Sequence, residues 1–192
     1  MFVNEHDLIR ELQAGNQTAF KELFDSFSPQ VFNVAYRMLQ NKQDAEDVTQ
    51  EVFFQAYNSL KHFRAESQIS TWLYRIAVNR SLNHRRKSKL TRWLSLDFGE
   101  SEDDTDDSGF IGPTEDGPDV VIERKDTERI VQEAINSLPD QQRIAILLHR
   151  YEGLPYEEIS KIMCVTVASV ESRLHRAKVT LAKKLLPYKD EL

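Results

Sequence analysis

Apolar residues recur at intervals of three and four positions along most of the chain, a spacing that places them on one face of an α-helix. Near the amino terminus, Leu8, Ile9 and Leu12 form a short stripe that Gly15 ends. A second stripe follows and is interrupted at Ser28-Pro29, so we expect one helix to end there and another to begin at Pro29. The pattern predicts an all-α protein.

The next predicted helix runs from a cap at Asp44 to about Leu60, and it carries two different faces. Its packing stripe consists of Ala45, Val48, Val52 and Ala56. A separate face carries Asp47, Gln50, Glu51, Phe54 and Asn58. An exposed aromatic framed by acids and amides suits the centre of a protein interface, although single exposed apolar residues are also common on ordinary surfaces.

The pattern over residues 71–92 predicts a helix that carries basic, aromatic and amide side chains together. A loop over 61–70 is expected to precede it, with Ser70 as the helix cap. Between Arg75 and Arg92 there are seven Lys or Arg and no Asp or Glu. One face carries Leu73, Tyr74, Ala77, Val78 and Ser81, and the opposite face carries Trp72, Arg75, Asn79, Asn83 and Arg86. A solvated charged face would have mixed signs, so this pattern favours nucleic-acid binding.

The charge of the chain is unevenly distributed. The net charge is −6, but residues 95–122 contain ten acids and no Lys or Arg, so the remainder has a net charge of +4. This segment is rich in Gly-Pro pairs and poor in apolar residues, which indicates a flexible linker. We therefore expect two small helical domains, over residues 1–94 and 123–192, joined by an acidic linker over 95–122.

The second domain contains a helix-turn-helix pattern. Helices are expected near 123–137 and from Pro139 toward Gly153, followed by a short helix over 155–163, a turn at Cys164-Val165 and a long helix capped by Thr166. On the last helix one face is apolar, and the other carries Ser169, Ser172, Arg173, Arg176, Thr180 and Lys183. Such a face suits a recognition helix in the DNA major groove, although a plain helical hairpin would share the periodicity.

Other classes of protein lack support in the sequence. The glycines form neither a dinucleotide fingerprint nor a phosphate loop, and no Glu-x-x-His occurs, so neither catalytic residues nor a cofactor nor a metal site is expected. Cys164 is the single cysteine, and no apolar run approaches the roughly 20 residues that span a bilayer, which favours a cytoplasmic protein without membrane insertion. A stand-alone helix-turn-helix regulator remains an alternative, and its first domain would hold a ligand pocket.

Taken together, these stretches resemble the extracytoplasmic-function, or group IV, sigma factors of bacterial RNA polymerase. In the first domain, DAEDVTQEVFFQAYNSLKHFR and STWLYRIAVNRSLNHRR look like sigma region 2. In the second, SLPDQQRIAILLHRYEGLPYEEISKIM followed by VASVESRLHRAK looks like region 4. The resemblance covers nearly the whole chain, and both halves occur in the expected order.

The resemblance implies partners and a role for each surface. Asp47, Gln50, Glu51 and Phe54 would dock on the clamp of the largest polymerase subunit, and region 4 on the flap of the second-largest. The loop over 63–71 would capture unstacked bases of the minus-ten promoter element, together with Arg64, Trp72, Arg75, Asn79, Asn83 and Arg86. The minus-thirty-five element would be read by Thr166, Ser169, Ser172, Arg173, His175 and Arg176. An anti-sigma factor would mask both domains, and Glu171 stands where the family often has a basic residue.

Overall fold

The computed structural model describes residues 5–98 and 118–189, with side chains over 5–91 and 127–189. This part of the chain forms helices and no strand, which confirms the all-α prediction. In chain order the elements are α1 (Glu5–Gln13), α2 (Gln17–Leu39), α3 (Lys42–Ser59), the 3-10 turn η1 (Leu60–His62), α4 (Ile69–Phe98), α5 (Pro118–Asn136), α6 (Asp140–Arg150), α7 (Tyr156–Met163), α8 (Val167–Leu185) and η2 (Leu186–Tyr188).

The predicted break at Pro29 is wrong, because α2 continues through it. An internal proline loses one backbone hydrogen bond and crowds the preceding turn, at a cost of about 3 kcal/mol. The buried stripe nevertheless continues in register from Leu23 to Val31, Val34 and Met38, all almost fully buried. Burial of these side chains, each worth roughly 1.5–3 kcal/mol, outweighs the local penalty.

Two predicted helix caps are also wrong. Asn41 rather than Asp44 caps α3, since its side-chain oxygen accepts a hydrogen bond from the Asp44 backbone N–H at 2.9 Å. Ser70 does not precede α4 but lies within it, and the N–H of Ile69 donates instead to a carboxylate oxygen of Glu5 in α1 at 2.6 Å. A cap supplied from 64 residues away cannot be predicted from local sequence.

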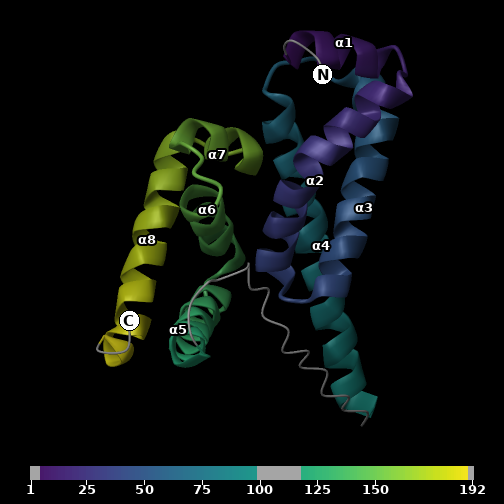
Figure 1. Ribbon diagram of the computed structural model, residues 1–192. Helices are drawn as coiled ribbons and strands as arrows, with labels where there is room; N and C mark the ends of the chain where they lie inside the picture. Colours follow the sequence, from purple (N-terminus) through teal and green to yellow (C-terminus); the bar gives the residue numbers. More distant parts are fainter. Residues whose placement is uncertain (1–4, 99–117, 190–192) are drawn as a thin grey trace.

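The first helical group is built from α1 to α4. Helices α2, α3 and α4 pack along one another, α1 lies across one end, and α4 extends past α3 at the other end (Figure 1). The packing stripe predicted for α3 is confirmed, and α4 contributes the buried side chains predicted for its apolar face: Leu73, Tyr74, Ala77, Val78 and Ser81. The opposite face of α4 is therefore left for other contacts.

The second group contains the predicted helix-turn-helix in α7 and α8. Ile159 and Ile162 point inward from α7, and Cys164 ends the helix in the left-handed conformation with φ of 53°. Thr166 caps α8 as predicted, because its hydroxyl accepts from the N–H of Ser169 at 3.2 Å. Helix α6 ends at Arg150, before the predicted stop at Gly153.

The predicted linker over 95–122 is overlapped by helix at both ends. Helix α4 continues to Phe98, and α5 begins at Pro118, earlier than the predicted start at 123. Residues 99–117 lie outside the described residues, so the division into domains 1–94 and 123–192 stays a prediction. Among the described helices, none combines the length and the apolar character that crossing a membrane requires.

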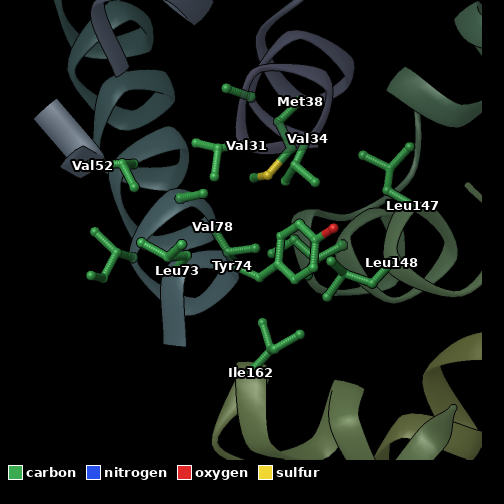
Figure 2. Close-up of a cluster of buried hydrophobic side chains, with 14 of the residues drawn as sticks. Val31, Val34, Met38, Val52, Leu73, Tyr74, Val78, Leu147, Leu148 and Ile162 are labelled. Atoms are coloured by element: carbon green, nitrogen blue, oxygen red, sulfur yellow. The ribbon is translucent and has the colours of Figure 1, made fainter. Parts of the chain in front are cut away.

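The two helical groups share a buried contact. Tyr74 of α4 lies among Val34 and Met38 of α2 on one side and Leu147, Leu148 and Ile162 of the second group on the other (Figure 2). Helices α7 and α6 thereby pack against α4 and α2. The sequence pattern placed Tyr74 on a packing face but could not say what packs there.

Candidate nucleic-acid and polymerase interfaces

The predicted polymerase-binding face of α3 is open to solvent. Phe54 is 71% exposed, whereas its neighbour Phe53 is 3% exposed and packs edge-on against Phe24 with ring centroids 4.7 Å apart. Asp47, Gln50 and Glu51 are also exposed. Adjacent phenylalanines can differ in this way because consecutive residues lie about 100° apart around the helix, and the predicted exposure of Phe54 is confirmed.

An arginine from α4 borders this α3 face. Arg80 donates from Nε to Gln55 at 2.9 Å and from Nη1 to Glu51 at 3.3 Å. Both Arg80 and Glu51 remain substantially exposed, so this pair contributes little to stability. Its main effect is to orient the Glu51 carboxylate on the surface that carries Phe54.

The face of α4 predicted to capture bases is only partly free. Asn79, Asn83 and Arg86 are exposed, as a binding face requires. Trp72 is half-buried and lies against Phe63, with ring centroids 4.9 Å apart. The structure therefore brings Trp72 to the loop over 63–71 rather than leaving it in solvent.

Two arginines predicted for the same surface differ in exposure. Arg75 is half-buried, and its Nε has no hydrogen-bond partner among the described residues. Arg64 is exposed in the loop, 3.9 Å from Glu66, an ion pair too loose and too solvated to restrain it. Arg64 is therefore exposed to solvent, whereas the Nε of Arg75 is buried.

Arg85 is not available for phosphate binding, contrary to the expectation from charge alone. Its guanidinium donates to the Met38 carbonyl at 3.3 Å and lies 3.5 Å from the Asp140 carboxylate. Asp140 also pairs with the buried Arg143 at 2.7 Å. These contacts join the end of α2, α4 and the start of α6. Local sequence does not indicate the pairing of Arg85 with Asp140, because the two residues lie far apart along the chain.

The polar face of α8 is presented to solvent as predicted for a recognition helix. Thr166, Ser172, His175 and Arg176 are exposed, and Ser169 and Arg173 are half-buried. The Nε of Arg176 donates to the Ser172 carbonyl one turn earlier at 3.2 Å, which restrains the guanidinium beside the helix. Val170, Leu174 and Ala177 are buried beneath this face.

Glu171 lies on the same face, in a shallow depression also lined by Ser172, His175, Arg176 and Lys178. Within the described residues Glu171 forms no ion pair with Lys178. A free carboxylate among hydroxyls, imidazole and guanidinium disfavours nearby phosphate and can accept a hydrogen bond from a cytosine amino group.

Sequence reasoning missed two polar contacts between the helical groups. The Thr71 hydroxyl donates to Glu158 of α7 at 2.5 Å, and the Tyr74 hydroxyl donates to Glu152 at 2.9 Å. Burial raises the pKa of Tyr74 and of Glu152, whereas hydrogen bonds from Lys161 and then Thr71 lower the pKa of Glu158. No local signal could reveal these pairs, because their members lie 87 and 78 positions apart.

These features describe an all-helical protein in which a bundle with a basic, amide-bearing helix is combined with a helix-turn-helix. Two family profiles match in this order: Sigma-70 region 2 over residues 23–91 and Sigma-70 region 4 over 128–181. The chain is 33% identical over 179 residues to the ECF RNA polymerase sigma factor SigW of Bacillus subtilis, covering 92% of this chain and 94% of that protein. It is 32% identical over 189 residues to the RNA polymerase sigma-H factor of Pseudomonas aeruginosa, covering 97% of each.

The chain belongs to the ECF sigma factors of the sigma-70 family, and its function is promoter-specific transcription initiation with bacterial RNA polymerase. Members of this family are not enzymes. Because both the region 2 and region 4 profiles match, the alternative of a stand-alone helix-turn-helix regulator with a ligand-binding first domain is wrong.

Solved structures share the fold. CnrH in complex with the cytosolic domain of CnrY has a TM-score of 0.68 at 22% identity, covering 96% of this chain and 98% of that one. The sigma factor RpoE in complex with the anti-sigma factor NepR, from Bartonella quintana, has a TM-score of 0.65 at 25% identity, covering 86% of this chain and 96% of that one.

Proposed function

We propose that this sigma factor uses three separate surfaces. The α3 face of Asp47, Gln50, Glu51 and Phe54 docks on the clamp of the largest polymerase subunit. The loop over 63–71 and the exposed face of α4 capture the minus-ten element, and α8 reads the minus-thirty-five element. Region 4 also contacts the flap of the second-largest subunit, in the cytoplasm where the polymerase works.

The observation that carries this proposal is the exposed amide pair on α4. Asn79 and Asn83 lie one turn apart on a helix whose opposite side is buried, so their side chains are displayed on a rigid support. An amide offers both a donor and an acceptor, which matches the pairing edge of a base. In a duplex that edge is occupied by the partner base, so this face suits an unpaired strand.

Strand capture favours promoter opening. Holding a flipped or unstacked base in a protein site offsets the unstacking cost of a few kcal/mol per base. The exposed Arg86 and its lysine neighbours contribute attraction to phosphates that is independent of sequence. Base reading and phosphate attraction thus come from one helix.

An anti-sigma factor is a further proposed partner. The related sigma factor RpoE of known structure is bound to the anti-sigma factor NepR. In this chain the exposed aromatic Phe54 and the polar residues around it would suit such a partner as well as the polymerase, so the two would compete.

Reconstitution with core RNA polymerase tests the minus-ten assignment. The Asn79→Ala, Asn83→Ala double variant is compared with Ser88→Ala, an exposed change on the same helix. A fluorescent-base assay measures opening of a fully paired promoter, and a separate titration measures duplex binding. We expect the double variant to lose opening and non-template-strand binding while duplex binding through α8 is retained. Normal opening of the fully paired promoter by the double variant would refute strand capture by this face.

A further inference from the structure

Helix α1 is hydrogen-bonded to both ends of the loop over 63–68, which joins η1 to α4. At the first end, Nε2 of Gln13 donates to the Phe63 carbonyl at 2.7 Å. At the second end, the Ile69 N–H donates to a carboxylate oxygen of Glu5 at 2.6 Å. Two side chains of one short helix thus bracket a loop that is proposed to capture bases of the minus-ten element.

The ends of this loop are buried and its centre is exposed. Phe63 is 8% exposed and Ile69 is 1% exposed, and the Phe63 ring lies against Trp72 with centroids 4.9 Å apart. The exposed side chains between the two ends are those of Arg64, Ala65, Glu66 and Gln68. This arrangement fixes where the loop begins and ends and presents its middle to solvent.

The centre of the loop has a conformation that a free chain would rarely keep. Ala65 has φ of 54°, in the left-handed region, where the Cβ of a non-glycine residue crowds the backbone. Within the loop, Arg64 lies 3.9 Å from Glu66, and Oγ of Ser70 lies 3.5 Å from Gln68, contacts that are long and exposed. The two hydrogen bonds from α1 are shorter and end on buried residues, so they restrain the loop more strongly than these contacts do.

Helix α1 is itself held in place by packing. Ile9 and Leu12 are buried, and α1 contacts α2 and η1 at one end of the bundle (Figure 1). The Glu5 carboxylate also lies at the amino end of α4, where the partial positive charge of a helix favours an anion. The support is therefore fixed to the bundle, and the side chains of Glu5 and Gln13 that reach the loop are exposed, so they can be changed without altering the core.

We propose that α1 preorganises the minus-ten loop, with Gln13 and Glu5 as positioning residues that hold its exposed centre in the conformation that accepts an unpaired base. This inference rests on the proposed role of the loop in minus-ten capture. A loop that is already ordered in the free protein loses little conformational entropy when the strand binds. When both hydrogen bonds are removed, the fraction of molecules with a competent loop falls, and the affinity for the strand falls by the same factor.

The test compares holoenzymes assembled from core polymerase and full-length sigma variants. The Glu5→Ala, Gln13→Ala double variant removes both bonds, Glu5→Gln keeps an acceptor oxygen for the Ile69 N–H, and Arg10→Ala is an exposed change on the same helix. Fluorescence anisotropy measures binding of a labelled non-template minus-ten strand, taken from a promoter selected out of a random library with the wild-type holoenzyme. A strand of the same length and scrambled sequence measures phosphate attraction alone.

We expect the double variant to bind the selected strand about tenfold more weakly than the wild type, and to bind the scrambled strand as the wild type does. Glu5→Gln and Arg10→Ala should bind both strands like the wild type. A purely structural role would give a different result, because a damaged bundle would also lose affinity for the scrambled strand and for core polymerase.

Unchanged binding of the selected strand by the double variant would overturn the inference, and so would an equal loss for both strands. If urea unfolding shows that the double variant is less stable than Arg10→Ala, Gln13→Glu gives the same test, because it keeps the size of the side chain and replaces the donor by an acceptor. The Asn79→Ala, Asn83→Ala variant separates the two proposals. A loss of selected-strand binding confined to that variant would overturn the inference alone, whereas wild-type binding by that variant would overturn the proposed function and the inference with it.

Discussion

Adjacent phenylalanines on α3 allow a docking role to be separated from a packing role. Phe53 is almost fully buried against Phe24, so Phe53→Ala should lower the free energy of unfolding by about 3–5 kcal/mol through lost burial and a residual cavity. Phe54 is 71% exposed, so Phe54→Ala should change that free energy by no more than about 0.5 kcal/mol. An interface aromatic of this kind contributes about 2 kcal/mol or more to binding, equivalent to a roughly 30-fold loss of affinity for core polymerase on truncation.

Urea unfolding followed by far-ultraviolet circular dichroism measures the stability difference. Titration of labelled sigma factor with core polymerase measures affinity. Lys42→Gln, an exposed change at the start of the same helix and away from the Phe54 face, is the control for an altered surface. A Phe54→Ala protein that unfolds at clearly lower urea would show that Phe54 packs in the core. A stable Phe54→Ala protein with unchanged polymerase affinity would show that the exposed ring is not part of the docking surface.

Three further predictions concern DNA and pH. Arg176→Ala should cost about 1–3 kcal/mol of minus-thirty-five affinity and relax preference at one base pair in a binding-site library; uniform loss across sequences would mean that Arg176 contacts phosphate only. The Arg86→Gln, Lys87→Gln double variant should reduce the slope of log DNA affinity against log salt concentration by roughly 0.7–0.9 for each cation removed. Arg85→Gln should instead lower the free energy of unfolding, measured in urea, by about 1–2 kcal/mol, because it breaks the contact with Asp140. Burial raises the pKa of Glu152 in the folded protein above its ordinary value of 4.5, so the wild type should lose stability as the pH rises from 4.5 through that raised pKa. Glu152→Gln should flatten this pH dependence in thermal melts at stepped pH. A variant whose melting temperature varies with pH as that of the wild type does would contradict this prediction.

Local patterning predicted the faces of single helices well. The periodicity of α3 separated Phe54 from the packing stripe of Val48 and Val52, and that of α4 separated Tyr74 from Asn79, because burial follows rotation around the helix axis. The helix-turn-helix and its Thr166 cap were predicted for the same reason, since a cap bonds to the backbone within three residues.

Errors arose where distant residues decide the local structure. Pro29 did not end α2, because tertiary burial of the residues around it exceeds the local cost of a proline. The start of α4 is set by Glu5, far away in sequence. Likewise Arg85 belongs to the basic stretch over 75–92 that favours nucleic-acid binding, but Asp140 from the second helical group engages it. Sequence spacing gives no information about which two helices meet.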